Sequence, residues 1–433
     1  MVKLENECNE IKTLFENETE EKDLDLVNEI LELTNSIEDY RKYVEITKHE
    51  VKFKHHVGVI QTENYRIQIL PKIWNDKRFD FGYINSNLFK LLMYAYASPK
   101  FDLPELSIDV NKTEFDLFEM IIAMYCKTLS EELKHGTYRR YKKVSYESSF
   151  LRGSLRLKDQ LTKVDQSRFD VDDFIFTSDN DLNRFFLYAN RKFKEISTNE
   201  SNTNLLNFID IILNSENVAY EESIKEIHFN RLNERFKIPY TCARIVLDGL
   251  LPRTGRGNSK TMMMLFDMNI VFELFFSNFI ERNKNEIFYE NGLWNILIQS
   301  SKRNFIFNKE GVTKRYTKPD LIAYNKNLKY IFDTKYKILE TNGIIEIDEL
   351  QEDLKHITSS DLYQAYVYSE LYGSTGTFLV FPGSKNELSE PYKFTENGKL
   401  LWVLTIKVDL NEIDWEKQLV NELKKKLLSI VNG

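Results

Sequence analysis

The spacing of apolar residues separates the first half of the chain into helical and strand-like stretches. Apolar positions recur at helical spacing in "LDLVNEILELTNSI", which predicts an amphipathic helix pair within residues 1–46. Residues 47–80 change to alternation, and "KFKHHVGVIQTENYRIQILPKI" predicts strands that turn at "TEN". Helical blocks are predicted next, over about 84–132 and 178–214. We interpret residues 1–46 as a solvated helical head; a partner-docking arm is the alternative.

From Thr261 the pattern changes to strands and helices that alternate. A long apolar helix is predicted first, and strands are predicted at 293–300, 318–324 and 329–337. A helix over 359–372 should end at Gly373, which suits the position after a helix. Strands at 377–382 and 399–408 and a last helix from Asp414 follow. This order predicts a mixed sheet flanked by helices, which is an α/β domain.

These elements together predict an α+β protein of several domains. Residues 1–46 form the head, and 47–260 form a β-rich and helical region for partner or DNA interaction. Residues 261–433 form the α/β domain. With 433 residues, the chain is long enough for two or three domains that each bury a core.

Composition and charge exclude several classes of protein. Hydrophobic residues make up 42% of the chain, which indicates an ordered globular protein. The most apolar stretch, "LFDMNIVFELFFSNFI", is shorter than a membrane span and contains two acids, so no membrane association is expected. Cys8, Cys126 and Cys242 are far apart, which favours a reduced, cytoplasmic protein without disulfides or zinc. "PRTGRGNSKT" lacks the spacing of a phosphate-binding loop, so we expect no bound nucleotide.

The net charge of −8 hides an uneven distribution. Residues 1–40 contain thirteen Asp or Glu and three Lys, a charge of −10, so the remaining chain carries +2. An acidic total therefore leaves room for a local DNA-binding surface. In residues 135–158, "HGTYRRYKKVSYESSFLRGSLRLK", Arg and Lys alternate with aromatic residues. This pattern suits binding to the phosphates and stacked bases of a nucleic acid. A solvated strand and loop is the alternative. The candidate DNA contacts are Arg139, Arg140, Lys142, Lys143, Arg152 and Arg156.

The stretch "KPDLIAYNKNLKYIFDTKYK" predicts a hairpin that carries charges among apolar residues. If its loop is Lys326-Asn327, Asp320 lies opposite Asp333, with Cβ atoms about 4.5–5.5 Å apart. Lys335 is two residues further along and projects from the same sheet face. Two adjacent carboxylates in an apolar sheet repel each other, so the pKa of at least one should rise, and a cation between them is expected.

The carboxylate oxygens and the neighbouring lysine predict a Mg²⁺ site that acts on a phosphate group. Mg²⁺ suits a site of two or three carboxylates, and Lys335 can orient a water or stabilise developing charge. Glu273, in the middle of an apolar helix, is a candidate third ligand, or it pairs with a base elsewhere. Gln364 in "DLYQAYVYSEL" positions a water or phosphate, or it is a plain interface residue.

The order Glu273, Pro319-Asp320, Asp333-Thr334-Lys335 and Gln364 resembles the PD-(D/E)XK nuclease superfamily. The surrounding motifs are more specific: "VGVIQTENYRIQILPKI", "SFLRGSL", "LFDMNIVFE", "KPDLIAY", "DTKYK" and "DLYQAYVYSELY" are similar to those of the McrC family. This family provides the nuclease subunit of McrBC-type, 5-methylcytosine-specific restriction systems. The resemblance covers residues 50 to 385 approximately.

The resemblance implies that residues 261–433 are a PD-(D/E)XK nuclease domain. It implies a Mg²⁺-dependent endodeoxyribonuclease with Asp320, Asp333 and Lys335 as catalytic core, and with Glu273 and Gln364 in support. It also implies a partner, an AAA+ GTPase ring like McrB, on which the N-terminal part docks and whose GTPase it stimulates. The expected substrate is double-stranded, modified DNA, and pairing of nuclease domains would cut both strands.

Two other functions compete with this interpretation. A self-sufficient restriction endonuclease would need its own base-reading surface, and the charge of +2 outside the head disfavours strong DNA binding alone. A non-catalytic activator of the GTPase would not need to keep costly buried charges.

Overall fold

The protein is described from a computed structural model. It describes residues 11–15, 19–21, 24–35, 40–46, 50–62, 64–76, 78–97, 116–165, 167–222, 226–251, 262–288, 292–299, 302–307, 313–338, 357–396 and 398–432. The chain forms two compact units, of which the first comprises Met1–Leu117, Leu251–Gly255 and Met263–Gly433. The second comprises Phe118–Leu250 and Arg256–Met262.

The N-terminal part of the first unit is built on two small sheets. One has the strand order β1-β6-β5-β10 and the other β2-β4-β3. The antiparallel pair β5–β6 turns where the sequence predicts it, since Thr62 N donates to Tyr65 O at 2.9 Å. The elements are β1 (Ile11–Phe15), β2 (Thr19–Glu21), α1 (Leu24–Asn35), η1 (Tyr40–Lys42), β3 (Val44–Ile46), β4 (Glu50–Phe53), β5 (His56–Gln61), β6 (Arg66–Leu70), η2 (Lys72–Trp74), α2 (Phe81–Tyr96) and β10 (Met262–Asp267).

Two local predictions differ from the structure here. Within 1–46 the described residues form one helix, α1, together with strands, and β1 pairs in parallel with β6. Residues 262–267 form strand β10 rather than the start of the long apolar helix. A continuous apolar run fits a buried strand as well as a buried helix, so periodicity could not separate the two. The division of the chain into three functional segments stays a prediction.

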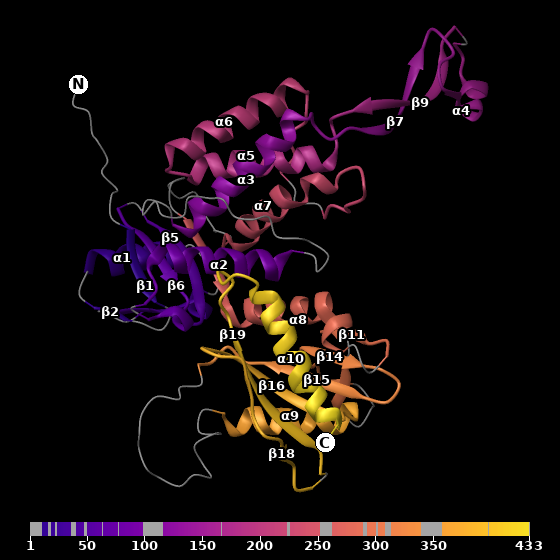
Figure 1. The fold of residues 1–433 in the computed structure, drawn as a ribbon. Helices are drawn as coiled ribbons and strands as arrows, with labels where there is room; N and C mark the ends of the chain where they lie inside the picture. The colour runs from indigo at the N-terminus through magenta and orange to yellow at the C-terminus, as the bar shows by residue number, and fades with distance from the viewer. Residues whose placement is uncertain are drawn as a thin grey trace. The chain divides into compact units, whose positions relative to one another are not determined.

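The C-terminal part of the first unit is a mixed sheet between helices (Figure 1). Its strand order is β11-β14-β15-β16-β19-β17, with β18 beside β19. Strands β15, β16 and β19 are parallel. At one side β14 pairs antiparallel with β15, and β11 pairs antiparallel with β14. At the other side β17 and β18 pair antiparallel with β19. The strands are β11 (Asn295–Ile298), β14 (Leu321–Tyr324), β15 (Lys329–Thr334), β16 (Gly376–Gly383), β17 (Glu387–Leu388), β18 (Tyr392–Lys393) and β19 (Leu400–Lys407).

Helices cover both faces of this sheet. On one face, Phe276 of α8 (Met268–Ile287) lies 5.7 Å from the Phe332 ring, measured between centroids. On the other face, Ala365 of α9 (Ser359–Tyr372) packs in a buried cluster with Leu379 and Val403. Helix α10 (Trp415–Asn432) packs beside α8, since the rings of Trp415 and Phe275 are 5.9 Å apart.

Helix α9 begins and ends with strong local signals. Thr358 and Asp361 form a reciprocal capping box at its start. Gly373 ends it in the left-handed conformation, with φ 60°, as the sequence predicts. These signals fix the helix that runs past the charged end of β15.

A separate hairpin, β12 (Arg303–Phe307) with β13 (Thr313–Thr317), leads into β14. It was not predicted, because its polar and aromatic residues do not alternate cleanly.

The second unit contains helices and one long arm. The helices are α3 (Leu117–Lys134), α5 (Asp181–Ile196), α6 (Glu200–Ser215) and α7 (Lys237–Gly249), with η3 (Glu234–Phe236). Figure 1 shows β7 (Arg140–Ser148) and β9 (Phe169–Thr177) as an extended two-stranded arm, to which β8 (Ser154–Leu155) and α4 (Leu157–Thr162) belong. The predicted mixed α+β architecture is therefore confirmed at this level. No helix among the described residues is both long and apolar enough to cross a membrane.

Candidate active site

The predicted register of the charged hairpin is confirmed by its strand pairing. Strands β14 and β15 pair from Tyr324–Lys329 to Leu321–Phe332. The loop is Lys326-Asn327, closed by Asn325 N donating to Leu328 O at 3.0 Å. Asp320 directly precedes the Leu321–Phe332 pair and Asp333 directly follows it, so both acids lie at the same end of the hairpin.

The two aspartates have different surroundings. Asp333 is 1% exposed, and apart from an ion pair its Oδ2 has no hydrogen-bond partner among the described residues. Asp320 is half-buried, and its Oδ2 accepts hydrogen bonds from Thr334 N and Thr334 Oγ1, both at 2.7 Å. Thr334 therefore holds Asp320 beside the end of β15.

Lys335 joins the acids to helix α9. Its Nζ lies 2.7 Å from Asp333 Oδ2 and donates to Gln364 Oε1 at 2.9 Å. The Gln364 amide donates to Tyr368 Oη at 2.8 Å, and that hydroxyl donates to Lys318 O at 3.2 Å. Gln364 thus orients the lysine, and Tyr368 in turn fixes the glutamine.

Glu273 enters from helix α8 through a third residue. Gln299 donates its side-chain amide to Glu273 Oε1 and accepts from Lys318 Nζ at 2.7 Å. Its backbone N donates to Asp320 O at 2.9 Å. Gln299 has φ 43°, a left-handed conformation that is uncommon outside glycine. This residue ties Glu273, Lys318 and Asp320 together.

Burial raises the pKa of all three acids, and the charge of Asp320 adds to the rise at Asp333 and Glu273. Burial, followed by the charge of Asp320, raises the pKa of Asp333 to about 7. Burial also raises the pKa of Asp320, against the hydrogen bonds from Thr334. The pKa of Glu273 rises because of burial and then because of Asp320. The pKa of these acids therefore rises as expected. A site in which buried carboxylates are costly to ionise is suited to binding a cation.

The donor set fits Mg²⁺ through two carboxylates. Within the described ranges, no three His, Cys, Asp or Glu side chains converge closely enough to hold a metal ion. Mg²⁺, however, is commonly held by one or two carboxylates together with waters and substrate phosphates. Asp320 and Asp333, whose pKa values burial raises, provide such a pair. Glu273 as a third ligand stays a prediction.

The sequence was compared with family models. The model of the McrBC 5-methylcytosine restriction system component matches residues 51–382, which is more than half of the chain.

This chain belongs to the McrBC component family. The resemblance to McrC inferred from the motifs is thereby confirmed.

One solved structure agrees with this membership at the level of the fold. A McrBC assembly from Thermococcus gammatolerans, described as McrB AAA+ hexamers with bound McrC, contains a similar chain with a TM-score of 0.62 and 21% identity. The similarity covers 97% of this chain and 100% of that one. A chain in another structure of the McrBC complex from the same organism has a TM-score of 0.49 and 24% identity, over 64% and 88% of the two chains. No curated protein sequence matches this chain.

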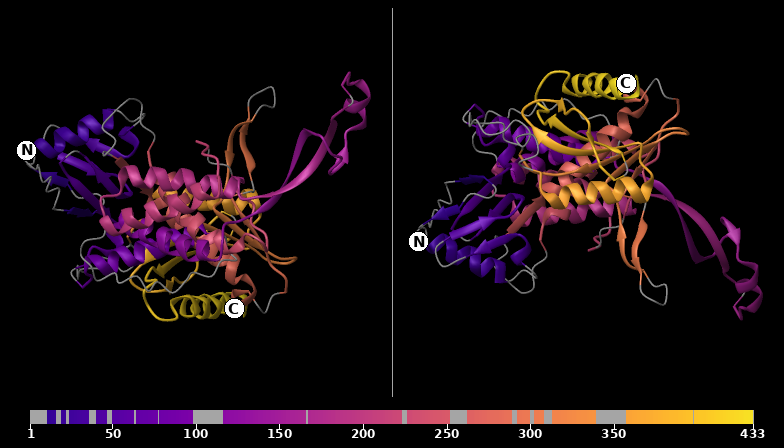
Figure 2. Two further views of the ribbon diagram at one scale, coloured as in Figure 1. Left: turned by 90° about the horizontal axis from the view of Figure 1, so that it is seen from above. Right: turned by 90° about the horizontal axis from the view of Figure 1, so that it is seen from below.

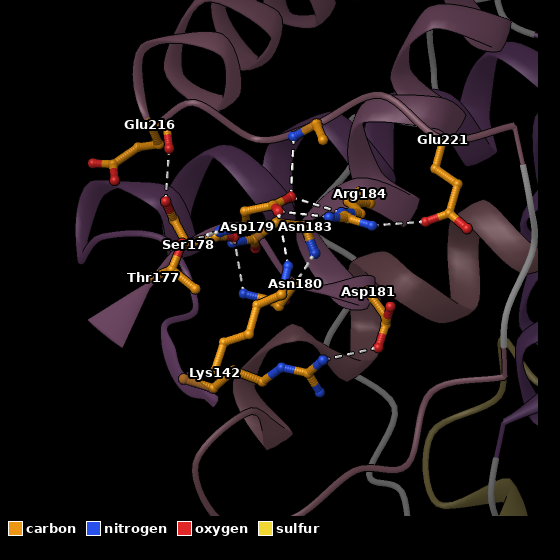
Figure 3. A network of polar contacts seen from close by, with 12 residues as sticks. Lys142, Thr177, Ser178, Asp179, Asn180, Asp181, Asn183, Arg184, Glu216 and Glu221 are labelled. Carbon is orange, nitrogen blue, oxygen red and sulfur yellow. Dashed lines mark hydrogen bonds and ion pairs between the residues drawn. The ribbon is translucent and has the colours of Figure 1, made fainter. Parts of the chain in front are cut away.

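In this McrBC-family chain, the basic residues that were predicted to contact DNA lie on and around the arm. Each of them is paired with an acid. The pairs are Arg139–Glu216 (2.6 Å), Arg140–Asp181 (3.1 Å), Lys142–Asp179 (3.6 Å), Lys143–Asp172 (2.6 Å), Arg152–Asp173 (3.2 Å) and Arg156–Asp159 (2.6 Å). Figure 3 shows that Asp179, at the base of the arm, also accepts from Arg184, at 2.6 and 2.5 Å. The DNA contacts of this basic segment stay a prediction.

The sequence analysis missed three residues of the site. Asp361 Oδ2 lies 2.7 Å from Lys337 Nζ, and its Oδ1 is 3.9 Å from Lys335 Nζ. The capping pattern Thr358-x-x-Asp361 was a usable signal for it. Tyr368 follows Gln364 by one helical turn, which also could have been noticed. Gln299 has no local signal, because its role depends on contacts with α8 and with the segment before β14.

Proposed function

We propose that this chain is the DNA-cleaving subunit of a McrBC-like, modification-dependent restriction system, a Mg²⁺-dependent endonuclease. The observation that carries the proposal is the grouping of Asp320, Asp333 and Lys335 at one end of the β14–β15 pair. These residue types in this order match the PD-(D/E)XK pattern. Family membership supports a place in a restriction system but leaves the chemistry to the site itself.

Each side chain has a role that follows from its contacts. Asp320 and Asp333 would hold Mg²⁺, which supplies a polarised water and charge neutralisation at the phosphate. Lys335, held by Gln364, presents its ammonium beside Asp333, where it can stabilise charge that develops on phosphate oxygens. Gln299 keeps Glu273 and Asp320 in place through its side-chain amide and its backbone N, and Phe276 of α8 packs on Phe332 of the sheet.

The partner in this proposal is an AAA+ GTPase ring like McrB. The similar chain from Thermococcus gammatolerans is bound to McrB AAA+ hexamers, which supports the same kind of partner here. Docking is expected through the N-terminal part, residues 47–260. The arm in this region exposes large apolar side chains, which favour contact with protein: Tyr141, Phe150, Leu151, Phe174 and Phe176.

The partnership is tested with purified components. The chain alone should cut DNA poorly and bind it weakly, because its net charge offers little counterion-release affinity. Addition of the AAA+ partner and GTP should start cleavage of double-stranded DNA, with modified DNA as the expected substrate, and EDTA should stop it. Cleavage is followed on gels.

The same experiment separates the two competing functions. Efficient sequence-specific cleavage by the isolated chain would establish a self-sufficient endonuclease instead. Stimulation of the partner's GTPase without any DNA cleavage, in Mg²⁺ and with modified DNA, would establish a non-catalytic activator.

A further inference from the structure

The hairpin β12–β13 carries positive charge directly beside the candidate active site. Its described strands with their flanking residues, 302–307 and 313–318, contain five Lys or Arg and no Asp or Glu. Strand β13 ends at Thr317, and Lys318-Pro319 then leads straight to Asp320. In both views of Figure 2 the two strands project as a narrow orange ribbon beyond the large sheet. A ligand on this ribbon would therefore lie next to the aspartates.

The base of the hairpin is fixed to helix α9. Arg303 donates to Leu371 O at 2.6 Å, and its guanidinium lies over the Tyr372 ring. The Tyr372 hydroxyl donates to Thr317 O at 2.8 Å. Because α9 also supplies Gln364, one helix positions both the hairpin and the lysine of the site. The ribbon is thus held in a set place relative to the acids.

Four basic side chains of the hairpin have no acidic partner among the described residues. Within the described part of the chain, Lys302, Arg303, Arg315 and Lys318 form no ion pair with a carboxylate. Lys302 and Arg315 are exposed, and the Lys302 ammonium lies 4.8 Å from the centre of the Tyr316 ring. Tyr316 is itself 56% exposed. Basic side chains without an acidic partner, next to an exposed aromatic ring, are available to an anionic ligand.

Strand geometry places these charges on both sides of the ribbon. Arg315 and Tyr316 are adjacent, so their side chains leave opposite faces. Lys302 shares the Tyr316 face, as their contact shows. A two-stranded ribbon fits the major groove of B-DNA, which is about 12 Å wide and has phosphates along both walls. A ribbon charged on both faces matches those two walls.

We propose that the β12–β13 hairpin enters a groove of double-stranded DNA and places the scissile phosphate at Asp320 and Asp333. The inference rests on the proposed nuclease function and names the surface that holds its substrate. It assigns DNA binding to Lys302, Arg315 and Tyr316, rather than to the basic segment of the arm.

The test measures DNA binding without catalysis. Fluorescence anisotropy of a labelled double-stranded oligonucleotide is recorded in EDTA with the full chain, over a series of salt concentrations starting at about 50 mM. The variant is Lys302→Ala/Arg315→Ala. It should bind several-fold more weakly, and the slope of log affinity against log salt should become shallower by about 1.8, for two lost phosphate contacts. Both residues are exposed, so the melting temperature should not change.

The matched control removes two exposed lysines elsewhere in the first unit. Lys385→Ala/Lys417→Ala changes the net charge equally and should keep the slope of the wild type. The proposal is overturned if the hairpin variant keeps the wild-type slope, if the control loses as much, or if the wild type does not bind DNA at all. It is also overturned if the hairpin variant keeps DNA binding but loses stimulation of the partner's GTPase. A wild type that binds through the hairpin but never cuts in Mg²⁺ with the partner and GTP would refute the nuclease function alone.

Discussion

The arm and the acid cluster both concentrate charged side chains, but they satisfy them in opposite ways. On the arm, Lys143 of β7 pairs with Asp172 of β9. Arg140 and Lys142 of β7 pair with Asp181 and Asp179, which follow the end of β9. Hydrogen bonds from Lys143 and Ser145 lower the pKa of Asp172, and those from Arg184 lower the pKa of Asp179. The anions of this region are stabilised by residues of the chain itself.

At the end of β14–β15 the balance is reversed. Burial raises the pKa of Glu273, Asp320 and Asp333, and at Asp333 it outweighs the ion pair with Lys335. Folded proteins tolerate such a deficit where a ligand compensates it. The difference between the two regions supports the proposal that the arm's charges serve structure, whereas those of the cluster bind a cation and a phosphate.

The largest expected effect is on catalysis. Asp333→Ala and Lys335→Ala should each lower the rate of DNA cleavage by at least about a hundredfold, because they remove a carboxylate ligand or the cation beside the phosphate. Cleavage is measured with the AAA+ partner and GTP. Stimulation of the partner's GTPase should persist in both variants, and the exposed control Lys417→Ala should cut normally. Cleavage that survives in both variants would place the active site elsewhere.

The next effect is on stability, and it should have opposite sign in the two regions. Asp179→Asn should lower the free energy of unfolding by about 1.5–3 kcal/mol, because it removes charge-assisted hydrogen bonds from Arg184. Asp333→Asn should leave it unchanged or raise it in EDTA, because burial and the charge of Asp320 outweigh the ion pair with Lys335. Urea denaturation followed by circular dichroism measures both. A large loss for Asp333→Asn would make that residue a structural one.

The Asp179 contribution should also depend on pH in a defined direction. Its pKa in the folded protein is below the usual value of about 3.9, so its stabilising effect is complete above that value. The effect should disappear as the pH falls through the lower, folded pKa. The difference in unfolding free energy between wild type and Asp179→Asn should therefore be full near about pH 6 and shrink below about pH 4. A difference that grows on acidification would contradict the ion-pair explanation.

Local signals allowed much of the C-terminal fold and the centre of the site to be predicted. The two-residue loop at Lys326-Asn327 fixed the register that groups Asp320 with Asp333, and Gly373 marked the end of α9. Long-range contacts were not predictable. Gln299 acquires its role from its contact with Glu273 of α8. The basic residues of β7 pair with acids on β9 and just after it, which are distant in sequence. The basic run at 135–158 is paired with acids, whereas the described strands of the β12–β13 hairpin contain basic residues and no acid.

The smallest expected effect concerns the basic residues of the arm, compared with those of the β12–β13 hairpin. Lys143→Ala/Arg152→Ala removes two bases of the arm, as the hairpin variant removes two of its own. Lys143 Nζ lies 2.6 Å from Asp172, and Arg152 Nε lies 3.2 Å from Asp173. To bind phosphate, each base would have to leave its acid, which would then repel the DNA. In the same anisotropy assay, the salt slope should change by less than about 0.9, the value for one phosphate contact.

The acids of the arm provide the reciprocal variant. Asp172→Asn/Asp173→Asn should free those bases and tighten DNA binding modestly, with a steeper salt slope. If the arm variant instead weakens binding as much as Lys302→Ala/Arg315→Ala, the arm contacts phosphates despite its ion pairs. The six basic residues first singled out in the sequence would then form part of the DNA interface. If neither arm variant changes the slope, its charges are confined to holding β7 against β9, and substrate binding belongs to the hairpin beside Asp320.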